Sequence, residues 1–153
     1  MEQKKIRLKT GQALVEAVAA FAIVMIVLVG LLQLSNRSVT NSGEASRQAL
    51  ATTYVTEGLQ WVKDQRLSGW PGFKAYCGNT IPCSHTYCLN QLTWSVSGTC
   101  TSGNVGNTEY QRLLQLNGAN PLGKDEITAT VTVSWEEAGR MVTARQTFTF
   151  VDR

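Results

Sequence analysis

Hydrophobic residues follow three different patterns along the chain, and the first is a continuous apolar segment. Residues 17–32 are all apolar or glycine, and no charged residue occurs between Glu16 and Arg37. An uncharged stretch of this length spans a bilayer as a helix. The pattern predicts a transmembrane helix over residues 12–36. Glu16 lies near its beginning, where an ionised carboxylate is costly unless it finds a partner.

The second pattern is the helical periodicity of residues 44–66, which places apolar and polar residues on opposite sides of a helix. The apolar side consists of Leu50, Ala51, Tyr54, Val55, Gly58, Leu59, Trp61 and Val62, and the polar side of Thr52, Thr53, Thr56, Glu57, Gln60, Lys63 and Asp64. The sequence therefore predicts one long helix over residues 12–66 with an amphipathic second half. Residues 33–43 are poor in strong helix formers, so the helix could bend or melt there.

The third pattern follows Arg66, where glycines and a proline in residues 67–72 end the helix. The clearest strand signal is the alternation of threonine or serine with Ile127, Ala129, Val131, Val133 and Trp135. Other strands are expected near residues 89–96 and at 110–116 and 140–151, with a loop at 97–108 and a turn at 136–139. We therefore expect residues 67–153 to form a globular β domain. The fold class is α+β: a long N-terminal helix packed on three or four antiparallel strands.

The charges are concentrated at the beginning of the chain. The formal net charge is +3, but four of the 14 lysines and arginines and one of the 11 acids lie in residues 1–11. A chain that began at Gln12 would carry ten residues of each sign and be formally neutral. The basic leader agrees with the rule that positive residues beside a span stay cytoplasmic. The rest of the chain gives no indication of nucleic-acid binding.

The four cysteines lie close together, and their location decides their chemistry. If the leader stays inside, everything after the span is outside, where disulfides persist. Four cysteines allow three pairings, and the sequence does not choose among them. Our first choice is the local pairing, Cys77–Cys83 and Cys88–Cys100. Free thiols are an alternative, and so is zinc, although no C-x2-C spacing is present and we expect no metal site.

Few residues suggest catalysis, so we do not expect an enzyme or a cofactor. His85 is the only histidine, and it lies in a loop-like stretch without a paired acid or nucleophile. The adjacent Glu136 and Glu137 are typical of a solvated hairpin turn. Asp125 and Glu126 lack the loop signature of a calcium site.

The N-terminal segment Gly11-Gln12-Ala13-Leu14-Val15-Glu16, preceded by the basic leader, resembles the processing site of type IV prepilins and pseudopilins. The resemblance implies that a prepilin peptidase cleaves after Gly11 and methylates the new N-terminus at Gln12. Glu16 would then be the fifth residue of the mature chain and dock the N-terminus of a neighbouring subunit. Many members carry Phe or Met where this chain has Gln12. The site is also similar to that of Tad-type pilus proteins.

A second stretch, residues 54–66 with Glu57-Gly58-Leu59, is similar to the helix end of many minor pilin-like proteins. Together these motifs imply a structural subunit of a type IV pilus or a related pseudopilus. It would be made as a single-pass precursor in the inner membrane with a cytoplasmic N-terminus, and would then join an extracellular or periplasmic filament. The implied partners are other pilin subunits, a prepilin peptidase, an assembly ATPase and a platform protein.

Two other readings of the N-terminus compete with this one. A cleavable secretory signal also has a basic start and an apolar core, but residues 34–38 make a poor small-x-small cleavage site. A simple membrane anchor would make Glu16 incidental. In that case the chain would be a non-polymerising single-span protein with an extracytoplasmic binding domain.

Overall fold

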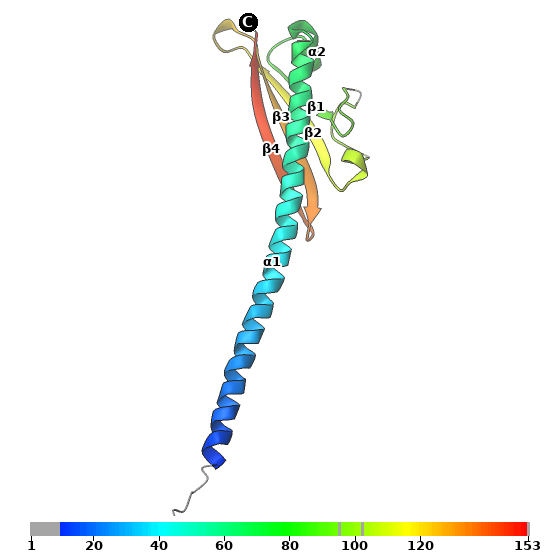
Figure 1. Cartoon of the computed structure of the whole chain (residues 1–153). Coiled ribbons are helices and arrows are strands. Elements are labelled where there is room, and N and C mark those ends of the chain that lie inside the picture. The colour runs from blue at the N-terminus through cyan, green and yellow to red at the C-terminus, as the bar shows by residue number, and fades with distance from the viewer. Residues whose placement is uncertain (1–9, 95, 102, 153) are drawn as a thin grey trace, which may run out of the picture. The chain divides into compact units, whose positions relative to one another are not determined.

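A computed structural model describes residues 10–94, 96–101 and 103–152, although the side chains of residues 10–13 and 36 are outside the description. The elements in chain order are α1 (Thr10–Leu67), α2 (Trp70–Cys77), β1 (Cys83–Cys88), η1 (Val105–Asn107), β2 (Gln111–Ala119), η2 (Pro121–Gly123), β3 (Glu126–Glu137) and β4 (Arg140–Val151). A long helix and a four-stranded antiparallel sheet confirm the predicted α+β class (Figure 1). The chain divides into two compact units, one ending at Ala45 and the other beginning at Ser46.

The first unit contains the N-terminal part of α1. Every described side chain from Leu14 to Ala45 is exposed. The helix contains a window with a mean hydropathy of 2.7, which makes it long and apolar enough to cross a membrane. Residues 33–43 are helical throughout, although the sequence allowed a bend or a loss of helix there. The leader, residues 1–9, lies outside the described residues.

The second unit contains a meander in which neighbouring strands are also consecutive in the sequence. The sheet order is β1-β2-β3-β4, and every pair is antiparallel. The alternation predicted for β3 is confirmed, because Ile127 and every second residue up to Trp135 are buried. β4 matches the predicted range, and β2 extends beyond it to Ala119. Since β4 forms one edge of the sheet, only Phe150 among its residues is buried.

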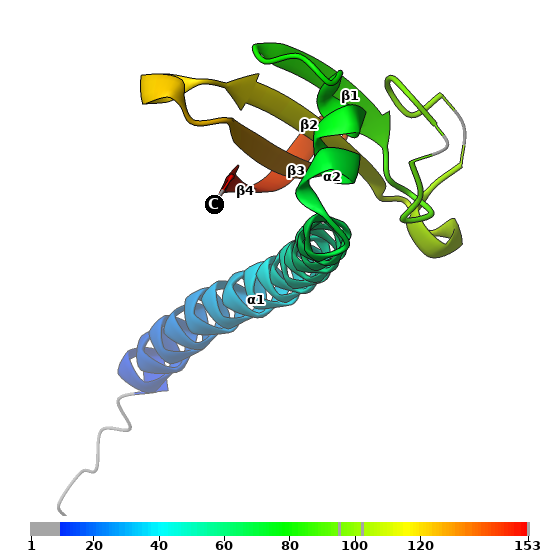
Figure 2. The ribbon, with the colours of Figure 1, turned by 90° about the horizontal axis from the view of Figure 1, so that it is seen from above.

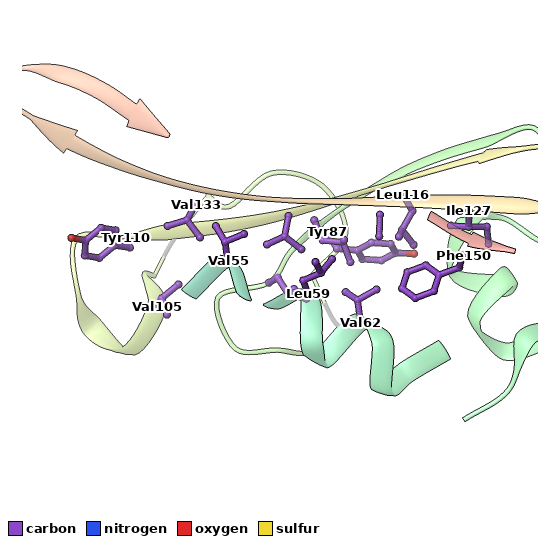
Figure 3. Packing of buried hydrophobic residues seen from close by; sticks show 14 of the residues in the cluster. Val55, Leu59, Val62, Tyr87, Val105, Tyr110, Leu116, Ile127, Val133 and Phe150 are labelled. Carbon is purple, nitrogen blue, oxygen red and sulfur yellow. The ribbon is translucent and has the colours of Figure 1, made fainter. Parts of the chain in front are cut away.

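The core lies between the sheet and the C-terminal part of α1. Ala51, Val55, Leu59 and Val62 recur at helical spacing, and all four are buried. Figure 3 shows the side chains of Val55, Leu59 and Val62 together with those of Leu116, Ile127 and Val133 from the strands. The predicted apolar side of the helix is therefore the side that packs. Leu50 is the exception, since 41% of its surface is exposed.

A short helix, α2, follows α1 and begins within residues 67–72, which the sequence predicted only as the end of the long helix. Pro71 lies in the first turn of α2, where a missing N–H group costs nothing. Gly78 ends the helix with φ of 126° and donates its amide to the carbonyl groups of Lys74 and Ala75. Phe73 and Cys77 lie one turn apart on α2, and both side chains are buried in the core. Figure 2 shows α2 on the same side of the sheet as α1.

The first strand is β1, which precedes the stretch where the sequence predicted a strand. The prediction of a strand near residues 89–96 is wrong, because the described residues of that stretch form none. The chain turns at this point: the amide of Leu92 donates to the carbonyl of Leu89 at 3.1 Å, and Leu92 has φ of 51°. The segment Cys83–Cys88 is mostly polar, so hydrophobic periodicity could not reveal it. Its pairing with β2, from Cys83↔Gly118 to Cys88↔Leu113, makes it a strand.

The cysteines form two disulfides, Cys77–Cys83 and Cys88–Cys100, which confirms our first choice of pairing. No cysteine is free, so the alternatives of thiols and zinc ligands are wrong. Gly118 on β2 lies beside the first disulfide. A Cβ atom at this position would overlap Sγ of Cys83 and also come within 3.4 Å of Sγ of Cys77. The disulfide can therefore lie against β2 only where β2 lacks a side chain.

We predict that Gly118→Ala lowers the free energy of unfolding by about 1–3 kcal/mol, because the added methyl group overpacks the disulfide. The measurement is denaturant unfolding of the full-length protein in detergent, followed by tryptophan fluorescence. Gly72→Ala in α2 is the matched control, since a Cβ there meets no atom within 4 Å. The control should be neutral or stabilising by up to about 1 kcal/mol. Equal stability of the two variants would contradict the close contact.

Candidate functional site

The first candidate site is the beginning of α1, where the sequence placed the processing and docking residues. Gly11 and Gln12 belong to the first turn of the helical backbone, and their side chains are outside the description. Glu16 follows Gln12 by four residues, so both lie on one face of the helix. The Glu16 side chain is exposed and makes no ion pair within the described part of the chain.

Glu16 is the only charged residue between Leu14 and Ser35. The residues close to it in the sequence are exposed and apolar, for example Val15 and Val18. In water the carboxylate is solvated, but in lipid or in a bundle of apolar helices it is not. There the group either binds a proton or requires a cation. None of the described residues of this chain supplies that cation.

The second site is a buried arginine that connects the strands to the helix. Arg112 on β2 is 1% exposed, and Nε donates to the carbonyl of Leu89 at 3.0 Å. Nη1 donates to the carbonyl of Tyr54 at 2.9 Å and to Oε2 of Glu57 at 2.7 Å. The backbone amide of Arg112 donates to Oδ1 of Asn90 at 2.7 Å. One side chain therefore holds together α1, β2 and the turn that follows β1.

Glu57 and Gly58 have separate roles beside Arg112. The Glu57 side chain is 51% exposed, so its carboxylate stays partly solvated while it neutralises the guanidinium. Gly58 leaves room for the arginine, because a Cβ atom there would lie 2.9 Å from Cδ of Arg112 and 3.1 Å from Cγ1 of Val131. The Glu57-Gly58 pair singled out in the sequence thus has a structural purpose: it accommodates and neutralises a buried cation.

Sequence reasoning did not identify Arg112 as a structural residue. The available signal was its phase, since Arg112 alternates with Leu114 and Leu116, which face the core. A charge at an inward position of a strand calls for a partner. The apolar side of α1 offers none, but the acidic Glu57 lies at its margin. The sequence contained both halves of the pair, but only the strand register brings them together.

The other polar candidates are engaged in the fold. His85 lies on β1 rather than in a loop, and its exposed ring stacks beside Tyr87. Asp125 pairs with Lys74 and accepts a hydrogen bond from Asn120. The described residues contain no group of three or more His, Cys, Asp or Glu side chains that could hold a metal ion. No protein-family model, curated protein or solved structure matches the chain.

Two tyrosines at the edges of the core act as neutral hydrogen-bond donors. The hydroxyl of Tyr87 donates to the carbonyl of Tyr76 at 2.7 Å, and that of Tyr110 to the carbonyl of Arg47 at 3.3 Å. Burial raises the pKa of Tyr87, and the neighbouring Tyr76 raises it further. Burial also raises the pKa of Tyr110, with a smaller contribution from Glu109. Both groups therefore stay protonated at neutral pH, as their donor roles require.

We predict that Arg112→Met lowers the free energy of unfolding by about 2–3 kcal/mol, because it removes the hydrogen bonds of the buried guanidinium to Leu89, Tyr54 and Glu57. Glu57→Gln should cost about 1 kcal/mol or less, since the carboxylate is half exposed and water screens the pair. Arg145→Met, at an exposed position of β4, is the control and should change stability by no more than about 0.5 kcal/mol. Denaturant unfolding in detergent measures all three. If Arg112→Met is as mild as the control, the buried arginine is dispensable.

Proposed function

We propose that this protein is a structural subunit of a type IV pilus or a related pseudopilus. The observation that supports the proposal most is the single carboxylate of Glu16 within an exposed apolar helix. The basic leader and Gly11 precede it at the spacing that resembles a prepilin processing site. In this proposal the precursor spans the inner membrane once, with its N-terminus in the cytoplasm. A prepilin peptidase, an assembly ATPase and a platform protein act on it.

The physics of assembly follows from the exposed helix. The apolar side chains from Leu14 to Leu34 can leave lipid only if another apolar surface replaces it. Copies of the same helix in neighbouring subunits provide such a surface. In that water-free bundle Glu16 needs a counter-charge, because an unpaired buried charge is strongly destabilising. The α-amino group of Gln12 on the next subunit would supply it and fix the register between subunits.

The globular unit suits a location outside the cytoplasm. Two disulfides stabilise the region from Cys77 to Cys100, and such bonds persist in oxidising compartments. The positive leader before the span favours the same orientation, with the cysteines on the far side of the membrane. The subunit would therefore expose the unit that begins at Ser46 on a filament outside the inner membrane.

We predict that the mature protein begins at Gln12 and carries a methyl group on its α-amino nitrogen. Gly11 replaced by a bulky residue should leave the full-length precursor in the membrane, because the peptidase no longer accommodates the cleavage site. Mass spectrometry of the intact protein and of its N-terminal peptide gives the answer directly. Native protein that still starts at Met1 in cells with an active prepilin peptidase would contradict the proposal and favour a simple membrane anchor.

We predict that Glu16→Ala inserts into the membrane but is lost from filaments. Removing the carboxylate spares the precursor a desolvation cost, so insertion should be as good as in the wild type. In the filament the neighbour's ammonium would be buried alone, at a cost of about 3–5 kcal/mol, or roughly a hundred- to thousand-fold per contact. Glu16→Asp should be intermediate, since the charge remains but its reach is one methylene shorter.

The measurement is the ratio of filament-associated subunit to membrane pool after shearing. Glu44→Ala is the matched control, because Glu44 is an exposed glutamate of the same helix outside the apolar segment. It should assemble like the wild type. Should Glu16→Ala enter filaments at the level of Glu44→Ala, the docking role of the carboxylate is wrong.

A further inference from the structure

The connection between β2 and β3 exposes a leucine in an unfavourable backbone conformation. Leu122 lies in η2 with φ of 57° and ψ of 28°, the left-handed region that favours glycine or asparagine. Its relative exposure is 103%, the highest among the exposed large apolar residues of the described chain. The loop thus holds an apolar side chain in water on a strained backbone. Neither feature helps the isolated subunit to fold.

Hydrogen bonds connect the two sides of the loop that carries Leu122. The amide of Lys124 donates to the carbonyl of Pro121 at 3.2 Å, and Nδ2 of Asn120 donates to Oδ1 of Asp125 at 2.9 Å. Asp125 in turn forms an ion pair with Lys74, and its carbonyl accepts the amide of Asp152 at 3.0 Å. These contacts restrict the backbone of the loop before any partner arrives, which lowers the entropic cost of binding.

A groove lies at the opposite end of β2. It has a volume of about 400 Å³ and is lined by Ser46, Arg47, Leu50, Asn107, Thr108, Glu109 and Tyr110. Leu50 is the residue of the apolar side of α1 that the sheet leaves exposed. Arg47 borders the groove and contacts Glu109 at 3.6 Å and Glu137 at 3.5 Å. The groove thus combines the exposed apolar surface of Leu50 with a mainly polar lining, in which Arg47 is paired with Glu109 and Glu137.

We propose that Leu122 of one copy inserts into the Leu50–Tyr110 groove of a second copy of this chain. This inference rests on the proposed function and names a contact between subunits. The charges agree: Lys124, beside Leu122, makes no ion pair within the described residues, and the Glu109 side chain at the groove is 46% exposed. Lys124 would approach Glu109 when the leucine is seated, which gives the docking its orientation.

The positions of the two surfaces allow the contact with a second copy to repeat along a filament. Tyr110 immediately precedes β2 and Pro121–Gly123 follows it, so the groove and the loop lie at opposite ends of a nine-residue strand, which is about 30 Å long at the usual rise per residue. A contact between two different surfaces of identical subunits is heterologous, and when it does not close into a ring it propagates as a filament. The strain at Leu122 persists in the monomer because the contact compensates for it in the assembly.

The first test separates folding from assembly, because the proposal predicts opposite effects. Leu122→Asn and Leu122→Gly place residues that tolerate the left-handed backbone, so the melting temperature of the detergent-solubilised protein should stay equal or rise. Their incorporation into filaments should fall by about tenfold or more, as expected for a lost buried leucine. Leu67→Asn is the matched control: Leu67 is 80% exposed but lies outside the groove, and this variant should assemble normally.

The second test identifies the partner by disulfide cross-linking in sheared filaments. Leu50→Cys combined with Leu122→Cys should give a ladder of dimers and larger products on a non-reducing gel, whereas each single variant should stay monomeric. Leu122→Cys combined with Phe148→Cys tests the other apolar groove, which Phe148 and Leu67 line. A ladder from that pair, or a product containing a different subunit, would overturn the proposed contact.

The outcomes also distinguish this inference from the function on which it rests. Wild-type protein that never enters a filament fraction overturns both. If the wild-type protein enters filaments and the Glu16→Ala variant does not, the proposed pilin function stands, whatever the result for the Leu122 variants. If Leu122→Asn then assembles as well as Leu67→Asn, only the contact between Leu122 and the groove is wrong.

Discussion

The packing of α1 on the sheet depends on a close approach at Gly58, where the side chain of Arg112 crosses the helix. The glycine gives the arginine its space, and the arginine uses that space to bond the helix backbone, the turn after β1 and Glu57. Apolar contacts on either side are less directional, since Val55 and Leu59 only need to avoid water. Arg112 adds the geometric requirement, because a buried guanidinium has few positions in which its donors are satisfied. The register between helix and sheet is fixed there.

Much of the fold could be predicted where one face of an element is buried and the other is wet. β3 and the second half of α1 are such elements, and in both the period of the hydrophobic residues identified the buried side. β1 carries no such pattern, because it is a polar strand whose formation is decided by its partner β2. α2 was missed because Pro71 and Gly72 ordinarily end helices, yet a proline in the first turn is compatible with one.

The residues of the candidate sites also differ in how far the sequence alone could identify them. Glu16 could be singled out from the sequence because its cost depends only on the apolar residues beside it. Arg112 could not be assigned, since its partners come from two separate segments, α1 and the turn after β1, that only the tertiary structure brings to β2. The exposed Leu122 gave no sequence signal at all, because its unusual property is a backbone angle. Local composition reveals a charge in an apolar segment, but not a strained apolar loop.

The two disulfides have a consequence for the order in which the chain can fold. Both close short loops, with sequence separations of 6 and 12, and both lie before β2. The β2-β3-β4 meander contains no cysteine and consists of two successive hairpins, so its contacts are local and form without an oxidant. Oxidation therefore acts on α2, β1 and the loop after it, which have fewer buried residues of their own. In a chain that is not yet oxidised, the β2-β3-β4 meander would already have formed, and α2, β1 and the loop after β1 would still be incomplete.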